Sequence, residues 1–260
     1  MNKLWAVVTG ASSGIGKEIA IELSKKGYNL ILVARRLHLL EELAKNLNVE
    51  TICLQADLTD ESACHKVFME ATLNKNIQIL INNAGIGDYG SFVKTPLERH
   101  LKMIDLNIKS VTILAHLFAN HMLNHKQQSY ILNVASIGAF QTVPKLGAYC
   151  GTKKYVKDVS ETMSYELENS NVSVSCLSPG GTYTEFMENA NQVLKKGSDI
   201  FMMSASSVAQ IAVRQMFVRK RQIVPGLMNW LTTIFAKVVP SKLQLSINNF
   251  FYTRAVEEVH

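Results

Sequence analysis

Short runs of valine, isoleucine and leucine alternate along the chain with longer segments in which apolar residues recur every three or four positions. The short runs predict strands at residues 4–9, 30–33, 51–54, 77–81, 131–134 and 172–177, and the longer segments predict helices between them. Nearly continuous apolar runs, such as 77–81, are typical of strands that are buried on both faces. The pattern therefore predicts an α/β fold, a Rossmann-like, doubly wound parallel sheet of at least six strands with helices on both faces.

Composition narrows the class of protein. The 260 residues are 47% hydrophobic and 18% charged, which excludes a disordered chain, and no repeat or linker divides them, so a single domain over residues 1–260 is expected. The four cysteines form no C-x-x-C pair, which argues against a redox dithiol or a zinc knuckle. The amino terminus has no signal-peptide pattern, so a cytoplasmic protein is expected.

The net charge of +6 is concentrated near the carboxyl end, where residues 201–260 hold seven basic and two acidic side chains. Such a segment can face nucleic acid, an anionic membrane or an acidic partner. Because the aromatic and glycine-rich patterns of RNA-binding modules are missing from the sequence, no nucleic-acid partner is expected.

A glycine-rich turn follows the first predicted strand and contains Gly10, Ser12, Ser13, Gly14, Ile15 and Gly16. Its Gly-x-x-x-Gly-x-Gly spacing differs from the usual G-x-G-x-x-G, but it stands in the same place between a strand and a helix. Glycines there let the backbone approach a pyrophosphate at the positive end of the helix. The turn therefore predicts a dinucleotide-binding site.

The end of the second predicted strand bears on the choice of dinucleotide. An NAD enzyme places a carboxylate here, which accepts hydrogen bonds from the ribose 2′-hydroxyl. This chain has Ala34, which offers no acceptor, followed by Arg35 and Arg36. Unless both arginines are merely solvated surface residues, their guanidinium groups suit a 2′-phosphate, and NADP(H) is the predicted cofactor.

Further motifs follow in order along the chain. The run Asn82-Asn83-Ala84-Gly85 follows the fourth predicted strand, and Ser136 stands thirteen residues before Tyr149, which is followed four residues later by Lys153. Pro179-Gly180 follows the sixth strand. With the glycine-rich turn, these motifs resemble the classical short-chain dehydrogenase/reductase family over roughly residues 3–190.

Two other segments narrow the resemblance. Ala34-Arg35-Arg36, together with Ile223-Val224-Pro225-Gly226 and the amphipathic segment after it, resembles the NADPH-dependent reductases near the hydroxysteroid dehydrogenases and 3-ketoacyl reductases. The resemblance implies reduction of a ketone or aldehyde, lipid-like or 3-ketoacyl compounds among them, by a homodimer or homotetramer. Its cofactor-binding and catalytic core would occupy residues 3–190, and residues 191–260 would hold a substrate loop and the amphipathic segment.

The resemblance also implies which residues hold the cofactor besides the turn and the two arginines: Asp57, Leu58, Asn83, Ala84, Gly85, Tyr149, Lys153, Pro179, Gly180, Thr182 and Thr184. A second glycine, Gly181, departs from the family pattern and leaves the contacts of both threonines open. Substrate specificity is expected in the segments 88–93, 140–144 and 183–201, because variable loops carry it.

Four residues are the candidate catalytic groups: Asn107, Ser136, Tyr149 and Lys153. Carbonyl reduction needs a proton donor, and a phenol with a pKa near ~10 serves poorly at neutral pH until a cation lowers that pKa. Lys153, one helical turn after Tyr149, is predicted to be this cation. Ser136 is predicted to stabilise the developing alkoxide, and Asn107 to kink its helix and free a carbonyl for a proton relay.

Two other functions remain open at this point: a non-catalytic NADP(H)-binding sensor or scaffold, and an NAD-dependent alcohol dehydrogenase. Metal binding is not expected, since His121 and His125, four residues apart, have no third ligand indicated. Cys150, beside Tyr149, is expected to be a buried spectator because no base is placed near it by spacing.

The segment after Gly226 predicts an amphipathic helix with one apolar face, formed by Leu227, Trp230, Leu231, Ile234, Phe235 and Val238. It is too short to span a bilayer. Three interpretations are open: the face packs on the substrate cleft or the sheet, as such faces usually do, it forms a subunit contact, or it makes a peripheral membrane contact beside basic residues.

Overall fold

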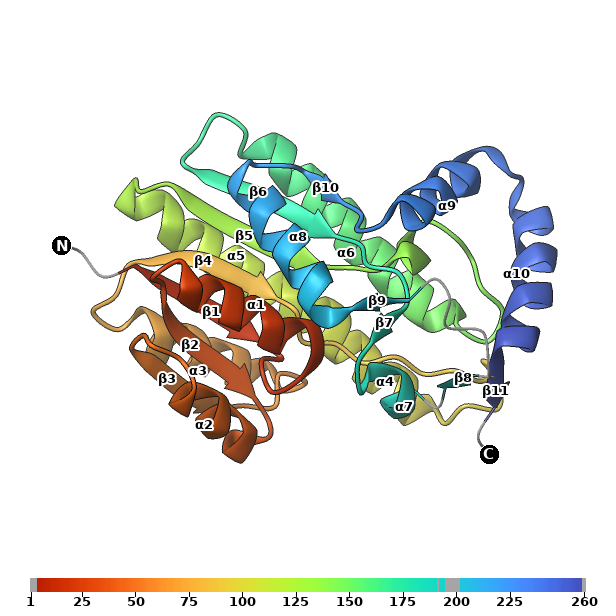
Figure 1. Cartoon of the computed structure of the whole chain (residues 1–260), viewed down its shortest axis with the longest axis horizontal. Helices are drawn as coiled ribbons and strands as arrows, with labels where there is room; N and C mark the ends of the chain where they lie inside the picture. Colours follow the sequence, from red (N-terminus) through yellow and green to blue (C-terminus); the bar gives the residue numbers. More distant parts are fainter. Residues whose placement is uncertain (1–3, 191, 195–201, 259–260) are drawn as a thin grey trace.

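A computed structural model of the chain describes residues 4–190, 192–194 and 202–258. Seven parallel strands form the central sheet in the order β10-β6-β5-β4-β1-β2-β3 (Figure 1). They are β1 (Trp5–Thr9), β2 (Asn29–Ala34), β3 (Thr51–Gln55), β4 (Ile77–Asn82), β5 (Ser129–Val134), β6 (Val172–Leu177) and β10 (Gln222–Ile223). The predicted fold class is confirmed, and β10 is an additional strand whose two residues are too few to form a recognisable apolar run.

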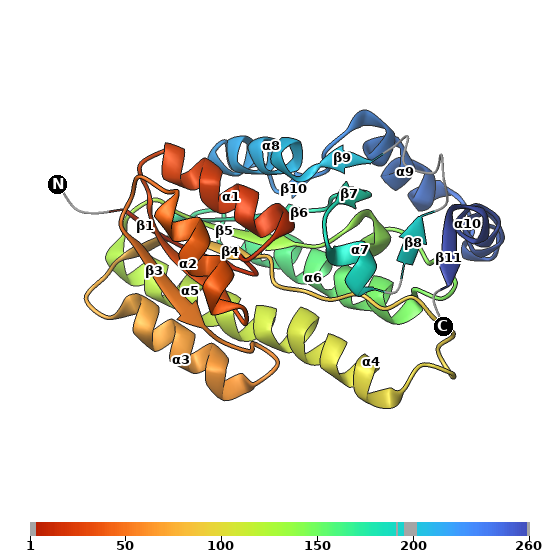
Figure 2. The same ribbon diagram turned by 60° about the horizontal axis from the view of Figure 1, so that its bottom comes forward.

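Helices cover both faces of the sheet (Figure 2). One face carries α1 (Gly14–Lys25), α2 (Leu37–Lys45) and α8 (Ala205–Phe217), and the other carries α3 (Glu61–Thr72), α5 (Ser110–His125) and α6 (Gly147–Glu166). Because successive side chains of a strand point to opposite faces, Val8 packs under the first set of helices while Val7 packs under the second. This double burial explains the continuous apolar runs in the sequence.

The strand order reverses between β1 and β4, which places a crevice at the carboxyl ends of these strands. Several short elements surround this end of the sheet: α4 (Leu97–Ile104), the π-helical turn η1 (Asp105–Lys109), the 3-10 turn η2 (Ile137–Ala139) and α7 (Phe186–Asn189). Two small sheets pair β7 (Thr182–Tyr183) with β9 (Met203–Ser204) and β8 (Gln192–Leu194) with β11 (Val256–Glu258). The specificity segment predicted at 183–201 lies partly outside the described residues.

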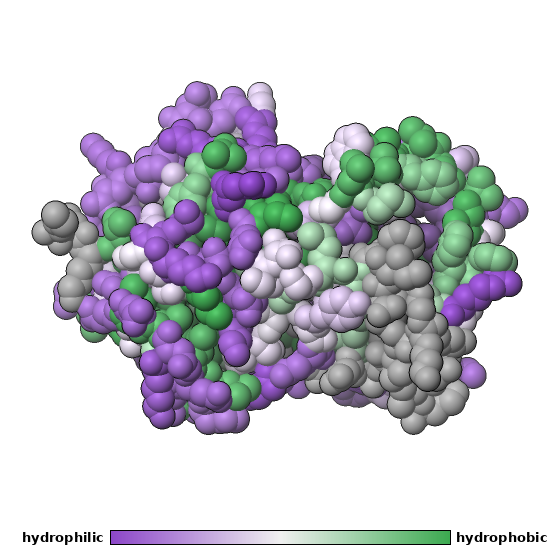
Figure 3. All heavy atoms as spheres, in the orientation of Figure 1, coloured by the Kyte–Doolittle hydropathy of each residue, from purple (hydrophilic) through white to green (hydrophobic). Residues whose placement is uncertain are grey.

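The predicted amphipathic helix forms as α9 (Leu227–Val238), but its apolar face points to solvent. The six side chains predicted for that face are 41–75% exposed, whereas Asn229, Thr233 and Ala236 are buried. Figure 3 shows hydrophobic surface over α9 and over α10 (Ser241–Ala255), which follows it. The interpretation in which this face packs on the cleft or the sheet is therefore wrong.

A close approach between α9 and the loop after β6 explains this orientation. A Cβ atom at Gly180 would collide with the side chain of Asn229, so the two backbones lie too close for a large residue between them. Asn229 Nδ2 donates to the carbonyl of Pro225 at 2.7 Å, and Thr233 Oγ1 donates to the carbonyl of Trp230 at 2.7 Å. Small side chains that satisfy their own polar atoms therefore face inward, and the large apolar ones face outward.

Within the described residues, no helix combines the length and the apolar character that crossing a membrane requires.

Candidate active site

A cavity of about 710 Å³ opens at the carboxyl ends of the central strands. Every residue predicted to bind the cofactor or to take part in catalysis lines it, except Gly16 and Asn107, which lie behind the lining. Residues up to 242 positions apart in the sequence, Gly10 and Tyr252, line this one space. The cavity therefore lies where ligands bind in open parallel sheets.

The glycine-rich turn forms one wall of the cavity, and hydrogen bonds from Asn83 hold it in place. Gly14, with a φ of +57°, opens α1, and a Cβ atom at Gly16 would collide with Asn83 and with the carbonyl of Gly10. Asn83 Nδ2 donates to the carbonyl oxygens of Thr9 and Gly10 at 3.0 and 3.1 Å. The turn thus leaves the first N–H groups of α1 directed at the cavity, an arrangement that suits a phosphate.

The side chain of Arg36 lies over this turn. Its Nη2 donates to Ser13 Oγ at 3.1 Å, to Ser12 Oγ at 3.3 Å and to Glu185 Oε2 at 2.8 Å. The hydrogen bond from Arg36 holds the pKa of Glu185 below its usual value. Glu185 lies in the predicted specificity segment 183–201, but its bond to Arg36 could not be predicted, because the two residues are 149 positions apart and share no motif.

Arg35 and Asp57 lie side by side at the ends of β2 and β3. Burial opposes ionisation of Asp57, but hydrogen bonds from Thr59 and the charges of Arg35 and Lys102 lower its pKa. Lys102, on α4, also lines the cavity and was not predicted. Leu58 is buried beside them. This corner of the cavity consequently places the cations Arg35 and Lys102 beside the Asp57 carboxylate.

The Tyr149 and Lys153 side chains occupy one face of α6, at the inner end of the cavity. Lys153 Nζ donates to the carbonyl of Val134 at 2.9 Å and lies 5.9 Å from the centroid of the Tyr149 ring. The hydroxyl of Tyr149 hydrogen-bonds Ser136, whose Oγ accepts from the backbone N–H of Gly138 at 3.1 Å. Tyr149 and Ser136 therefore contact each other directly, and Lys153 lies beside the Tyr149 ring.

The expected lowering of the phenol pKa by Lys153 is wrong for this structure. Burial raises the pKa of Tyr149, and the hydrogen bond to Ser136 offsets this only in part. Burial also lowers the pKa of Lys153 to about 8. Burial removes both groups from water, and desolvation shifts each pKa in the direction that favours the neutral form.

Asn107 lies in η1, the π-helical turn between α4 and α5. The Asn107 side chain accepts from the N–H of Ile86 at 2.9 Å and donates to its carbonyl at 2.8 Å and to Thr152 Oγ1 at 3.0 Å. Asn107 thereby fastens the loop after β4 to α6 next to Lys153. A role in a proton relay remains a prediction.

The loop after β6 completes the cofactor side of the cavity. The N–H of Ile137 donates to the carbonyl of Pro179 at 3.0 Å, which ties this loop to the segment carrying Ser136. Thr182 Oγ1 donates to the carbonyl of Gly180 at 3.0 Å, and Thr184 Oγ1 accepts from the N–H of Phe186 at 3.3 Å. Both threonines therefore bond within their own loop while they line the cavity.

The part of the cavity that lies beside Tyr149 and away from the glycine-rich turn is apolar. Its lining there includes Val143, Leu146, Cys150, Phe186 and Tyr252, and the Phe186 ring lies 5.6 Å from the Tyr149 ring. Two of these residues come from the predicted specificity segments, but Tyr252 comes from α10 and carries no motif that could have indicated it. Burial raises the pKa of the Tyr252 phenol to about 12 and that of the Cys150 thiol to about 11. Cys150 is buried, as predicted, and unactivated.

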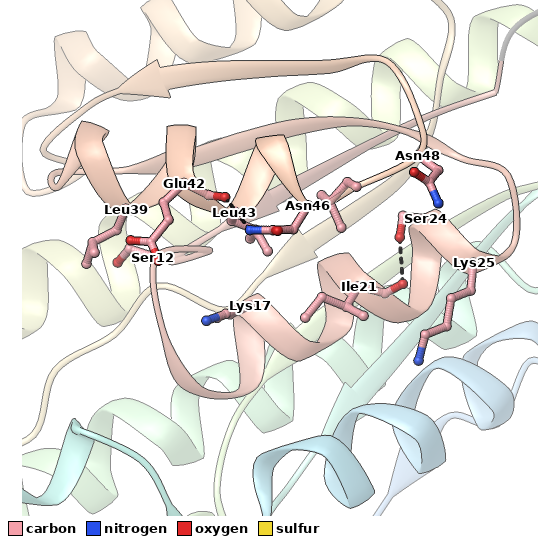
Figure 4. A pocket seen from close by; sticks show the side chains of 11 residues that line it. Ser12, Lys17, Ile21, Ser24, Lys25, Leu39, Glu42, Leu43, Asn46 and Asn48 are labelled. Carbon is pink, nitrogen blue, oxygen red and sulfur yellow. Dashed lines mark hydrogen bonds between the residues drawn. The ribbon is translucent and has the colours of Figure 1, made fainter.

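A second hollow, of about 470 Å³, lies between α1 and α2 on the outer side of the glycine-rich turn (Figure 4). It shares only Ser12 with the predicted site. Two of its polar side chains bond within their own helices: Asn46 Nδ2 donates to the carbonyl of Glu42, and Ser24 Oγ donates to that of Ile21. None of the four candidate catalytic residues lines this hollow.

The histidine pair on α5 holds the start of β4. His121 Nε2 accepts from the N–H of Ile77 at 3.1 Å, and His125 Nε2 lies 3.0 Å from its carbonyl. Among the described residues, no group of three or more His, Cys, Asp or Glu side chains is placed to hold a metal ion. The two histidines thus serve the fold by pairing backbone groups at a strand end.

Comparison with known proteins gives consistent matches. Residues 4–195 match the short chain dehydrogenase family. Over 184 residues the chain is 33% identical to 7beta-hydroxysteroid dehydrogenase of Clostridium sardiniense, covering 69% of this chain and 70% of that protein. It is also 33% identical over 182 residues to a very-long-chain 3-oxoacyl-CoA reductase of Phaeosphaeria nodorum, covering 66% of this chain but only 53% of that protein.

Solved structures of short-chain dehydrogenases also resemble this chain. A short-chain dehydrogenase from Sphingobium yanoikuyae in complex with NADPH superposes with a TM-score of 0.79 at 29% identity, covering 90% of this chain and 93% of that one. One from Burkholderia phymatum in complex with NAD has a TM-score of 0.80 at 22% identity, covering 90% and 92%, and shows the shared fold. The chain therefore belongs to the short-chain dehydrogenase family and is an oxidoreductase that acts on carbonyl and alcohol groups.

Proposed function

We propose that this protein reduces a carbonyl group to an alcohol with NADPH, and that Tyr149 gives the proton to the carbonyl oxygen. The observation that carries the proposal is the meeting of Tyr149, Ser136 and Lys153 at the inner end of a cavity whose outer end holds the glycine-rich turn and Arg36. When bound, NADPH supplies the hydride for this reaction.

The residues at the outer end fit a phosphorylated dinucleotide. The glycine-rich turn has no room for a Cβ atom at Gly14 or Gly16, and α1 begins there with its positive end toward the cavity. Arg35, Arg36 and Lys102 would hold the 2′-phosphate, because a dianion forms strong charge-assisted bonds with such groups. Arg36 would exchange its bond to Glu185 for one to the phosphate.

Each residue at the inner end has a chemical role in this proposal. Burial keeps the Tyr149 phenol protonated at neutral pH, so it can donate to an oxygen that becomes basic during reduction. Ser136, already bonded to Tyr149, would donate to the same oxygen and stabilise its charge. Lys153 would stabilise the phenolate that remains, and Asn107 is a positioning residue that holds α6 against the loop after β4.

The apolar end of the cavity indicates the class of substrate. Val143, Leu146 and Tyr252 offer contact surface and few polar partners, which suits a ketone on a sizeable hydrophobic body. The names of the 7beta-hydroxysteroid and 3-oxoacyl-CoA relatives support a lipid-like substrate of this kind.

Turnover with a panel of hydrophobic ketones tests the proposal, followed by the loss of reduced-nicotinamide absorbance. We expect faster turnover with NADPH than with NADH. Binding of NADPH without turnover of any ketone would favour the sensor or scaffold, and a preference for NADH would favour the NAD-dependent alcohol dehydrogenase.

We also propose that the protein assembles as a homodimer or a homotetramer. A hollow of about 720 Å³ beside α4 is surrounded by exposed apolar side chains, those of Phe92, Val93, Leu97, Leu101 and Ile104. Contiguous exposed patches of this kind are typical of protein–protein contacts, and a second copy is the occupant we propose. Sedimentation of the purified chain measures the assembly state.

A further inference from the structure

Two consecutive helices near the carboxyl end expose most of their large apolar side chains. On α9 these are Leu227, Met228, Trp230, Leu231, Ile234, Phe235 and Val238, each at least 41% exposed. On α10 they are Leu243, Leu245, Phe250 and Phe251, each at least 37% exposed. We call these eleven side chains the arm surface. Figure 3 shows it as hydrophobic surface along this edge of the molecule.

The two helices are held in place by polar bonds on their inner side. Gln244 Nε2 donates to the carbonyl oxygens of Ala236 and Val239 at 2.6 and 2.7 Å, which locks α10 against the end of α9. Asn248 Nδ2 donates to the carbonyl of Thr142 at 2.8 Å, which ties α10 to the loop that lines the cavity. The outward orientation of the arm surface is therefore built into the fold.

The charged side chains of α9 and α10 all have one sign. Residues 227–255 contain no aspartate or glutamate, and their charged side chains are Lys237, Lys242 and Arg254. All three are exposed, and the guanidinium of Arg254 lies 3.4 Å from the centroid of the Phe250 ring. An apolar face bordered by cations and containing aromatic rings is typical of helices that lie in the interfacial region of a membrane.

The arm surface could be covered by a second copy of the chain or by a lipid surface, and its positive charge distinguishes between the two. In a two-fold contact between copies, the same patch faces itself, so the cations of one copy would meet a patch that offers only cations in return. An anionic lipid surface supplies the opposite charge and lets long lysine side chains reach the head groups. We propose that the arm surface binds the interfacial region of an anionic lipid bilayer.

This binding would bring the membrane next to the substrate end of the cavity. Tyr252, on the same helix as Phe250 and Phe251, lines the cavity, while its two neighbours belong to the arm surface. A protein bound through this arm would hold its apolar pocket beside the lipid phase, where hydrophobic ketones collect. This last step rests on the proposed function, whereas lipid binding itself does not.

Sedimentation with vesicles tests the proposal directly, using the full chain and no substrate. We expect the protein to pellet with vesicles of phosphatidylcholine and phosphatidylserine and to stay largely in the supernatant with phosphatidylcholine alone. Changing both Lys237 and Lys242 to Gln should weaken binding roughly 10- to 30-fold, since each cation near an anionic surface contributes about a fivefold factor. Failure of catalysis would leave these measurements unaffected.

Tryptophan fluorescence gives a second, local readout. The chain has two tryptophans: Trp5 is buried in β1 at 4% exposure, whereas Trp230 is 48% exposed on the arm surface. Insertion of the arm should shift the Trp230 emission to shorter wavelength and protect it from aqueous quenchers. A variant with Trp5→Phe should keep the whole shift.

Variants on α9 and on α3 test whether vesicle binding needs the arm surface in particular or any exposed apolar side chain. Leu231→Ser with Phe235→Ser removes two exposed apolar groups from α9 and should abolish pelleting. Met69→Ser, at a 62% exposed apolar position on α3, should leave it unchanged. Circular dichroism checks that each variant folds.

Three results would overturn the proposal: no pelleting and no change in Trp230 emission with either vesicle, equal binding to both vesicles, or equal losses in the Met69 and α9 variants. A fourth would assign the face to a second copy instead. In that case the α9 variant would dissociate an oligomer in sedimentation without lipid, and the wild-type protein would bind neither vesicle.

Discussion

The two ends of the cavity are constructed in different ways. At the nucleotide end, backbone turns at the carboxyl ends of β1, β2 and β4 carry the binding groups, and hydrogen bonds such as those from Asn83 to the glycine-rich turn fix them. At the substrate end, side chains from separate segments, among them Val143, Phe186 and Tyr252, meet through apolar contact. Local motifs therefore mark most of the groups at the first end, while only the path of the whole chain brings together those at the second.

Tyr149 lies between the nucleotide end and the substrate end, and its substitution should have the largest effect on activity. Tyr149→Phe should lower kcat about 10²- to 10⁴-fold, because it removes a positioned proton donor. The dissociation constant of NADPH should change little, since the ring remains. Steady-state kinetics and a binding titration measure the two quantities.

The exposed Tyr165, also on α6, offers a control, and Tyr165→Phe should keep wild-type kinetics. Full turnover by the Tyr149 variant would contradict its role as the proton donor.

Arg36 probes the nucleotide end alone. Arg36→Ala should weaken NADPH binding about tenfold, because a charge-assisted bond to the phosphate is lost from a partly exposed site, and should leave NADH binding unchanged. Glu185→Gln should act in the opposite direction and strengthen NADPH binding a few-fold, since it removes the anion that competes for Arg36. Titrations with both cofactors measure this, and equal losses for NADPH and NADH would contradict a phosphate-binding role.

Tyr252 probes the substrate end alone. Tyr252→Ala should raise KM for a bulky ketone about fivefold, because apolar contact area is lost, without changing the affinity for NADPH. Tyr252→Phe keeps the ring and should restore KM. If the alanine variant weakened NADPH binding as much as it raised KM, the two ends would not be independent.

The lowered pKa of Lys153 makes the free energy of unfolding depend on pH, and this is the smallest of the expected effects. Its pKa of about 8 lies below the ordinary 10.5, so between these pH values the unfolded chain binds more protons and the free energy of unfolding rises with pH. Above pH 10 the raised pKa of Tyr149 acts in the opposite direction, because the folded phenol keeps its proton longer.

Lys153→Met should remove a rise of about 1 kcal/mol in the free energy of unfolding between about pH 7.5 and about pH 9. Urea unfolding at both pH values measures it, and the exposed Lys154→Met variant should keep the wild-type rise. An identical rise in the Lys153 variant would show that this lysine is not desolvated.

Particular residues show how far sequence patterns lead. The strand at 77–81 could be predicted because burial on two faces leaves a continuous apolar run in the sequence. The turn at 10–16 could be predicted because close backbone packing requires glycines at fixed positions. The bond between Arg36 and Glu185 leaves no local pattern, since its partners are 149 residues apart. The pKa of Tyr149 was predicted in the wrong direction, because four-residue spacing shows which groups are near and does not show how much water they lose.

By itself, the sequence determined the order of strands and helices, the glycine-rich turn and the face of α6 that carries Tyr149 and Lys153, since each depends on residues within a few positions of one another. Only the tertiary structure decided which side of α9 faces inward and which distant side chains close the cavity. The apolar stripe on α9 is plain in the sequence, but the close approach of Gly180 to Asn229 turns it outward. Orientation of a helix depends on the space its neighbours leave, and that space is set by the assembled fold.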